Sequence, residues 1–179
     1  MEVQLLCRVS CGYHRPVVDQ VALRDVNPAD EEFLLRLYAT TRPEVGMFGW
    51  DEAEQATFLL MQYDMQKRSY AIQCPGAEWS VILLEGQPAG RIIIDRKTDA
   101  ISLTDIAVAP EFRKRGIATT LVTRLEDEAT RTGRAIDLTV DRMNVDAFHL
   151  YRRLGFQVTG EDQVHLTMRW NPPPATSKK

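Results

Sequence analysis

The spacing of apolar residues changes repeatedly between strand-like and helix-like periods along this chain. Short apolar or alternating runs predict six strands, and longer stretches with apolar residues three and four positions apart predict four helices. The predicted strands are 19–26, 79–84, 89–96, 100–109, 135–141 and 164–170, and the predicted helices are 28–41, 51–72, 116–132 and 145–154. A loop at 42–50 separates the first two helices, and Pro75-Gly76 ends the second. This order predicts an α+β domain.

The strand predicted at 100–109 changes its apolar phase part-way. Ile101 and Leu103 are apolar at odd positions, whereas Ile106 and Val108 are apolar at even positions. A regular strand would move its apolar side chains to the other face there. One extra residue near 104–105 would restore the phase, as in a β-bulge. A strand buried on both faces is the alternative, because alternation then carries little information.

A short basic turn after this strand leads into the next helix. Arg113, Lys114 and Arg115 precede Gly116, where the helix opens, and Ala118 follows. Free backbone N–H groups and the helix dipole favour a phosphate at such an N-terminus. The turn therefore predicts an anion site, and a solvated basic turn is the alternative.

Two motifs resemble the GNAT superfamily of acetyl-CoA-dependent N-acetyltransferases. Arg113-x-x-Gly116-x-Ala118 resembles the family's (Arg/Gln)-x-x-Gly-x-(Gly/Ala) signature. The second motif, at the spacing expected after an intervening strand, is Asn144-x-x-Ala147-x-x-Leu150-Tyr151-x-x-x-Gly155-Phe156. The resemblance implies the acyl-CoA N-acyltransferase fold, with a mixed, mostly antiparallel sheet of six to seven strands that is flanked by helices and splayed at a bulge near 104–105.

The resemblance also implies the site residues. Backbone groups of Ile106, Ala107 and Val108 would bind the pantetheine arm of acetyl-CoA, and Tyr151 would protonate the departing thiol. Asn144 would contact the cosubstrate or only cap its helix, and a packed core residue is the alternative for Tyr151. The expected phosphate-binding residues are Arg113, Lys114, Arg115, Gly116, Ile117, Ala118 and Thr119.

At the positions expected for the general base, the chain departs from the family pattern. The positions that usually hold a glutamate contain Ser102, Thr104 and Thr139. Asp105 is the nearest carboxylate and is predicted either to act as the base or to bond the splayed backbone. Proton removal through water without a dedicated base is a further alternative. Weaker candidates are Glu111, Asp141, His149 and His165.

Acceptor specificity in the family lies mainly in the first two helices, their loop and the last strand. Here that region contains Met47, Phe48 and Trp50 in the loop, with Tyr63 and Tyr70 on the following helix. The loop aromatics would either close over a substrate or fix the loop to the core.

Length, net charge and cysteine count limit the classes of protein to which this chain can belong. A chain of 179 residues predicts a single domain, and a net charge of −3 argues against a nucleic-acid partner. No apolar run is long enough for a membrane span, and residues 1–12 do not resemble a signal peptide. Three cysteines, an odd number, predict a reducing cytoplasmic location. Cys7, Cys11 and His14 lack a fourth zinc ligand, so no metal is expected.

The sequence therefore predicts an N-terminal extension at 1–18, an acetyltransferase domain at 19–170 and a disordered tail at 171–179. The predicted function is transfer of acetyl from acetyl-CoA to a primary amine of a small molecule, by direct attack in a ternary complex. A protein N-terminal or peptide acetyltransferase is one alternative, because Phe112 to Ala118 resembles that branch. A non-catalytic acyl-CoA sensor is the other, because the usual base is missing. A homodimer is compatible with the resemblance, since dimers are common in the family.

Overall fold

The computed structural model describes residues 20–174 and has one seven-stranded sheet in the order β1-β2-β3-β4-β5-β7-β6. All neighbouring strands are antiparallel except β4 and β5. The strands are β1 (Val21–Asp25), β2 (Glu78–Leu84), β3 (Gln87–Arg96), β4 (Ala100–Val108), β5 (Ala135–Asp141), β6 (Gln157–Glu161) and β7 (His165–Trp170). The α-helices are α2 (Glu31–Ala39), α3 (Glu52–Gln73), α4 (Ile117–Thr132) and α5 (Val145–Arg153), and the short 3-10 helices are η1 (Pro28–Asp30), η2 (Pro43–Met47) and η3 (Pro110–Phe112).

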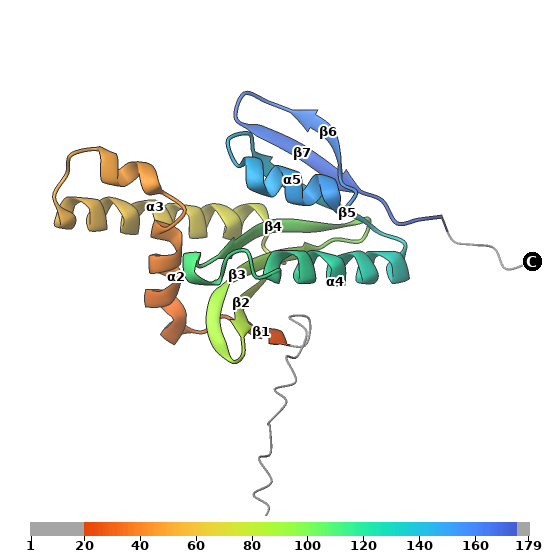
Figure 1. Cartoon of the computed structure of the whole chain (residues 1–179), viewed down its shortest axis with the longest axis horizontal. Coiled ribbons are helices and arrows are strands. Elements are labelled where there is room, and N and C mark those ends of the chain that lie inside the picture. The colour runs from red at the N-terminus through yellow and green to blue at the C-terminus, as the bar shows by residue number, and fades with distance from the viewer. Residues whose placement is uncertain (1–19, 175–179) are drawn as a thin grey trace, which may run out of the picture.

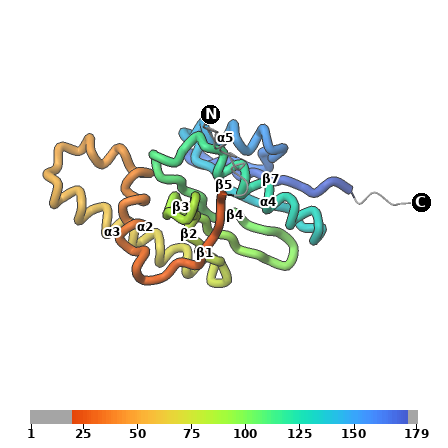
Figure 2. Tube along the Cα trace, turned by 60° about the horizontal axis from the view of Figure 1, so that its bottom comes forward, coloured from red at the N-terminus to blue at the C-terminus, as the bar shows by residue number. Residues whose placement is uncertain are grey.

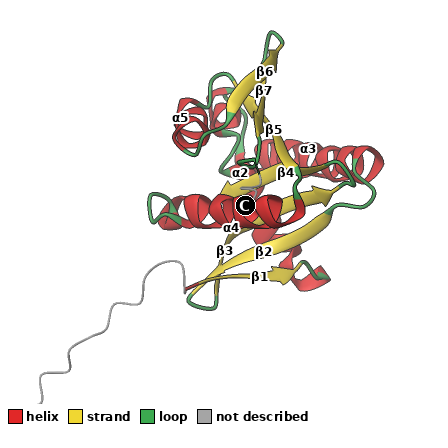
Figure 3. Ribbon diagram, turned by 90° about the vertical axis from the view of Figure 1, so that its right-hand side faces the viewer, coloured by secondary structure: helices red, strands yellow, loops and turns green. Residues whose placement is uncertain are grey.

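The helices lie on both faces of the sheet (Figures 1 and 3). On one face, α4 and α5 cover the main core, to which they contribute Leu121, Leu125 and Tyr151. On the other face, α2 and α3 enclose a smaller core that contains Leu34, Tyr63 and Ala109. The two cores place β4 between two sets of packed helices.

The predicted elements are largely confirmed, with a few local differences. The first predicted helix divides into η1 and α2, and part of the predicted loop forms η2. Strand β6 was missed, because Gln157–Glu161 is mostly exposed and contains Gly160, so it carries no clear apolar alternation. Its partner β7 supplies the antiparallel pairing that forms it.

The helix starts follow local capping rules. The Asp51 side chain accepts a hydrogen bond from the Glu54 N–H (2.9 Å), and the Glu54 carboxylate accepts one from the Asp51 N–H (2.9 Å). This capping box begins α3, which projects beyond the sheet together with η2 (Figure 2). Asn27 forms a similar box with Asp30 at η1.

Several predictions lie wholly or partly outside the described residues. These are the N-terminal extension, the cysteines at 7 and 11, His14 and the last five residues of the predicted tail. Within residues 20–174, no helix is long and apolar enough to cross a membrane. In the same part of the chain, no group of three or more His, Cys, Asp or Glu side chains could hold a metal ion.

Candidate active site

The bulge in β4 is confirmed by the register of its pairing with β3. Ile93 pairs with Asp105 and Ile94 pairs with Leu103, so Thr104 is the extra residue. The bulge restores the phase of the strand, because Ile106 and Val108 pack against the same core as Ile101 and Leu103. The β4 side chains before and after the bulge therefore serve one continuous core.

The sheet opens between β4 and β5 directly after the bulge. Their parallel pairing covers only Ala100–Leu103 of β4, so the strand from Asp105 onward pairs with β3 alone in the described structure. The Ala109 N–H donates to the Ala89 carbonyl (2.9 Å). Because hydrogen-bonded pairs alternate in an antiparallel ladder, the backbone groups of Ile106 and Val108 point toward the gap. The backbone of Ala107 points toward β3.

Close packing of β3 against β4 depends on Gly90. A Cβ atom at this position would lie 2.2 Å from the Ala107 carbonyl oxygen, far inside van der Waals contact. Glycine therefore lets the two backbones approach beside the residues that border the gap.

The basic turn forms an open helix N-terminus at the end of β4. Lys114 and Gly116 have positive φ angles of 60° and 80°, and Gly116 caps α4 without a side-chain hydrogen bond. The first helical hydrogen bond runs from the Thr120 N–H to the Gly116 carbonyl (2.9 Å), so the N–H groups of Gly116, Ile117, Ala118 and Thr119 have no acceptor within the helix. A Cβ atom at Gly116 would meet nothing within 4 Å, so space is open in front of these donors.

The three basic side chains of the turn have different surroundings. Arg113 points back into the fold, where its Nε donates to the Val108 carbonyl (2.9 Å) and its Nη2 donates to Thr40 Oγ1 (3.3 Å). Arg115 stacks over the Phe112 ring, with its Cζ 5.4 Å from the centroid. Lys114 is exposed. Arg113 therefore ties the turn to the end of β4, while Lys114 is at the surface beside the helix N-terminus.

Tyr151 belongs to the main core, where it is 6% exposed. Its ring lies 5.6 Å from that of Phe156. Burial raises the pKa of the Tyr151 hydroxyl to about 12, and the negative charge of Asp105 adds to this effect. Tyr151 therefore carries its proton at neutral pH. Asn144 caps α5 by accepting a hydrogen bond from the Ala147 N–H (3.1 Å).

Asp105 forms an ion pair with Arg91 on the face covered by α3. The Arg91 Nε donates to Asp105 Oδ2 (2.9 Å), and Nη2 lies 2.8 Å from the same oxygen. Arg91 also donates to Gln66 Oε1 on α3 (3.1 Å) and lies over the Trp79 ring at 5.8 Å. Both contacts of Arg91 are made to Oδ2, and within residues 20–174 no hydrogen bond to Oδ1 of Asp105 is found.

Tyr70 extends this cluster from α3. Its ring makes an edge contact with Trp79 at 5.8 Å. Burial raises the pKa of Tyr70 to about 12, again with a contribution from the charge of Asp105. The charge of Asp105 thus contributes to the raised pKa values of Tyr70 on α3 and of Tyr151 on α5.

The other candidate acids and bases occupy different surroundings. Asp141 accepts a hydrogen bond from the Met143 N–H (2.8 Å), and His165 Nδ1 lies 3.6 Å from Asp162. The Thr104 hydroxyl is 3.9 Å from the Cys74 sulfur. Glu111 is exposed in η3, and His149 is exposed on α5 beside the Phe148 ring.

Sequence reasoning missed Arg91, Gln66 and Gly90. A signal for Arg91 was present, since it lies beside three consecutive isoleucines in a predicted strand, and a buried charge requires a partner. No comparable signal identified Gln66 or the close approach at Gly90, because both depend on which elements pack together.

Comparison with known proteins agrees with this geometry. Residues 33–156 match the Acetyltransferase (GNAT) family. The chain belongs to this GNAT acetyltransferase family. The helix N-terminus at Gly116, the opening beside β4 and Tyr151 all lie within the matched residues.

Two curated relatives match part of this GNAT chain. An uncharacterized N-acetyltransferase of Methanocaldococcus jannaschii is 34% identical over 82 residues, covering 41% of this chain and 36% of the relative. N-alpha-acetyltransferase 20 of Dictyostelium discoideum is 33% identical over 81 residues, covering 42% of this chain and 47% of the relative. The matches therefore span less than half the length of either relative.

Solved structures support the same fold. The PaiA N-acetyltransferase of Thermoplasma acidophilum, solved in complex with coenzyme A, has a TM-score of 0.63 at 18% identity, covering 84% of this chain and 98% of that one. The spermidine N-acetyltransferase of Vibrio cholerae, solved with CoA and spermine, has a TM-score of 0.60 at 22% identity, covering 86% and 96%. At these identities the likeness concerns the fold, which is the predicted acyl-CoA N-acyltransferase fold.

Proposed function

We propose that this GNAT protein transfers the acetyl group of acetyl-CoA to a primary amine of a small molecule, by direct attack of the amine in a ternary complex. The observation that carries the proposal is the opening between β4 and β5, which ends at a helix N-terminus with free N–H groups. Both features suit a cosubstrate with an extended arm and phosphates. The odd cysteine count supports a cytoplasmic location for this reaction.

The residues of the turn would hold the phosphates of acetyl-CoA. The N–H groups of Gly116 to Thr119 are free to donate, and Lys114 and Arg115 add positive charge close to them. Arg113 would anchor the turn to the rest of the fold, because its side chain donates hydrogen bonds to the Val108 carbonyl and to Thr40 Oγ1. The site thus combines oriented backbone donors with charge, a combination that suits phosphate.

Backbone groups of β4 would hold the arm of the cosubstrate along the opening. Ile106 and Val108 direct their groups into it, whereas Ala107, between them, secures the strand to β3 and packs against the second core. Asn144 starts α5, which carries Tyr151, so its capping role would orient the helix at the thiol end.

Acetyl-CoA supplies the acetyl group as an activated thioester. The amine must lose a proton to attack, and Asp105 Oδ1 would take that proton directly or through water. The Val108 N–H would donate to the acetyl oxygen as negative charge develops on it. As the new C–N bond forms and the C–S bond breaks, Tyr151 would give its proton to the departing sulfur, and the proton that the nitrogen must lose to form the amide would return to Tyr151 through water.

The test measures release of free CoA thiol from acetyl-CoA by the purified protein with polyamines, amino acids, aminoglycosides and short peptides as acceptors. We expect acceptor-dependent release, with a small amine preferred over peptides. Tyr151→Phe should lower kcat by about 10²-fold or more, the range for a positioned acid, while acetyl-CoA affinity changes little. Unchanged kcat in this variant would remove Tyr151 from the proposed mechanism.

A second candidate is acetylation of peptide N-termini. It is favoured by the match to N-alpha-acetyltransferase 20, which covers part of both chains. The same acceptor panel distinguishes the two functions. A higher kcat/KM for short peptides than for every free amine would indicate a peptide acetyltransferase. Tight binding of acetyl-CoA with no thiol release for any acceptor would favour the non-catalytic sensor.

A further inference from the structure

Arg91 is the least exposed charged residue among residues 20–174, with 3% of its surface accessible. It lies in the middle of β3 and pairs across the sheet with Ala107, whose side chain packs against the core formed by α2 and α3. The guanidinium is therefore enclosed between the sheet and these helices. Because a buried charge costs free energy unless it is paired and hydrogen-bonded, the contacts of Arg91 indicate what this charge does.

The guanidinium of Arg91 joins three separate elements. On β4, its Nε (2.9 Å) and Nη2 (2.8 Å) contact Asp105 Oδ2, and on α3, its Nη2 also donates to Gln66 Oε1 (3.1 Å). On β2, it lies over the ring of Trp79, with its Cζ 5.8 Å from the centroid. Tyr70 packs edge-on against the same ring at 5.8 Å, which holds the ring in place. These contacts together fix the plane of the guanidinium.

Asp105 is the accessible end of this network. Its side chain is 20% exposed, whereas the side chain of Arg91 is 4% exposed. Both contacts of the guanidinium are made to Oδ2, and within the described residues no hydrogen bond to Oδ1 is found. A carboxylate turns easily about its Cβ–Cγ bond unless it is held. Arg91 therefore holds one oxygen and thereby sets the direction in which the other oxygen points.

Gln66 connects the guanidinium to the position of α3. Tyr63, one turn earlier on the same side of this helix, is 1% exposed and packs in the core between α3 and α2. The buried Tyr63 ring fixes this part of α3 against the rest of the fold. The amide of Gln66 is therefore presented to Arg91 by a firmly packed helix, and the placement of α3 reaches Asp105 through two consecutive side-chain contacts.

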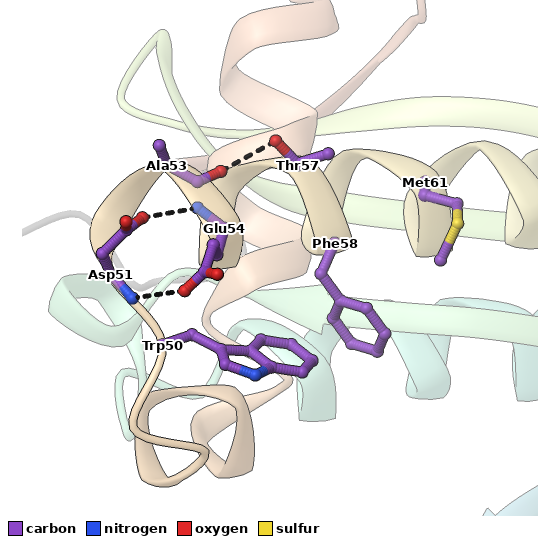
Figure 4. Close-up of a pocket in the computed structure, with 7 residues that line it drawn as sticks. All are labelled: Trp50, Asp51, Ala53, Glu54, Thr57, Phe58 and Met61. Atoms are coloured by element: carbon purple, nitrogen blue, oxygen red, sulfur yellow. Dashed lines mark hydrogen bonds between the residues drawn. The ribbon is translucent and has the colours of Figure 1, made fainter.

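The groove at the start of α3 is separate from this network. It has a volume of about 600 Å³, and Figure 4 shows Trp50, Phe58 and Met61 along it. Gln66 and Arg91 are not among the residues that line it. A substitution of Gln66 therefore tests the contact with Arg91 without changing the walls of the groove.

We propose that Arg91 and Gln66 are positioning residues for acetyl transfer. Gln66 orients the guanidinium of Arg91, and Arg91 holds the carboxylate of Asp105 so that Oδ1 faces the acceptor amine. Neither residue contacts a substrate, because both act through Asp105. This positioning role rests on the proposed function, in which Asp105 takes the amine proton. A misplacement of about 1 Å in such a group can lower a rate by about 10²-fold.

The test measures kcat and KM from the release of CoA thiol, with the best acceptor of the panel, for Arg91→Lys and Gln66→Leu. Lysine keeps the charge, but its ammonium group cannot replace the planar fork, so we expect kcat to fall about tenfold or more. Leucine cannot accept the hydrogen bond from Arg91, so we expect kcat to fall about threefold or more. KM for acetyl-CoA should stay within about twofold of the wild type, because the loss concerns the chemical step.

Two matched controls change comparable side chains elsewhere. Arg96→Lys alters an arginine of the same strand, which bonds to Glu128 through Nε (2.9 Å) and Nη2 (3.0 Å). Gln73→Leu alters a glutamine of the same helix, which donates to Ser69 Oγ (2.9 Å). Both controls should keep the kcat of the wild type. Thermal melts of all variants verify that each one folds.

Double-mutant cycles with Asp105→Asn determine whether each residue acts through this carboxylate. In the Asp105→Asn background, Arg91→Lys and Gln66→Leu should lower kcat no further. A separate structural effect would instead multiply with the loss caused by Asp105→Asn.

The outcomes distinguish the positioning role from the proposed function. Unchanged kcat in Arg91→Lys or Gln66→Leu, or losses that multiply fully with that of Asp105→Asn, would overturn the positioning role alone. Unchanged kcat in Asp105→Asn would overturn the role of Asp105 in the proposed function, and the positioning role with it. So would a wild type that releases no thiol with any acceptor.

Discussion

At the scale of single residues, the charge of Asp105 is central to the candidate site. Asp105 is held by buried Arg91, and its charge acts on Tyr70 from one face of the sheet and on Tyr151 from the other. Both tyrosines have pKa values raised to about 12, with burial as the main cause. Tyr151 therefore keeps its proton throughout the neutral range.

Asp105→Asn tests the role of this carboxylate. Asparagine keeps the size of the side chain but removes the charge, so we expect kcat/KM for the amine to fall about 10²-fold. Affinity for acetyl-CoA, measured by calorimetry, should change little. Asp99→Asn, in the exposed turn at the other end of β4, is the control. A lower melting temperature with unchanged kcat/KM would instead show that Asp105 has only a structural role.

Gly116→Glu tests the anion site. The new carboxylate would occupy the open space before the helix N-terminus and repel phosphate, so we expect acetyl-CoA binding to be lost. The positive φ of Gly116 adds strain of about 1–2 kcal/mol, which should leave the protein folded. Gly133→Glu is a matched control, because Gly133 has a φ of 67° and open space at the other end of α4. Equal acetyl-CoA affinity in the two variants would contradict the site.

At the scale of elements, the junction of β3 with β4 organises the opening. The bulge at Thr104 changes the course of β4, and the parallel pairing with β5 ends at Leu103. Beyond it, Gly90 permits the approach of β3 to Ala107. The end of β4 therefore pairs with a strand on one side only. On the other side the Val108 carbonyl accepts a hydrogen bond from Arg113 Nε (2.9 Å), and the other backbone groups of Ile106 and Val108 face the opening.

Gly90→Ala should disturb this junction selectively. Its new Cβ would clash with the Ala107 carbonyl, and the backbone must move to relieve the contact. We expect a loss of about 1–3 kcal/mol in the free energy of unfolding, as for other overpacked sites, together with weaker acetyl-CoA binding. Urea unfolding and calorimetry measure the two effects.

Gly76→Ala provides the control for this substitution, because a Cβ there would make only an ordinary contact of 3.8 Å with Asp95 Oδ1. Wild-type stability and acetyl-CoA affinity in Gly90→Ala would show that the close approach has no role in shaping the site.

At the scale of the whole molecule, two cores on opposite faces support one opening in the sheet. Helices α4 and α5 pack on one face, and α2 and α3 pack on the other (Figure 3). Each core contains a buried tyrosine, Tyr151 in the first and Tyr63 in the second, and Tyr70 lies close to the Asp105 cluster. Because of these tyrosines, the free energy of unfolding depends on pH in the alkaline range.

Tyr63, Tyr70 and Tyr151 all have pKa values raised from 10 to about 12, mainly by burial. Below pH 10 they are protonated in both folded and unfolded chains, so their contribution to stability is fully present. Between about pH 10 and 12 the unfolded chain loses protons that the folded chain retains, and the free energy of unfolding should fall. Urea titrations at several pH values, with tyrosinate absorbance, measure this loss. A constant free energy of unfolding across the window would contradict it.

The sequence determined most of the local structure. Apolar periodicity and end signals located the predicted helices and six strands, because these patterns depend on neighbours along the chain. The phase change around Thr104 indicated the bulge for the same reason. The glycine and basic residues at 113–118 indicated an open helix N-terminus, since backbone conformation and the dipole are local properties.

Only the tertiary structure decided how these parts act together. It paired Arg91 with Asp105, turned Arg113 toward Val108, and formed β6 from a segment without a clear pattern. It also placed Gly90 against Ala107 and left the outer face of α3 exposed. These features join residues from separate elements, and the free energy of such contacts depends on packing and burial that no stretch of sequence contains by itself.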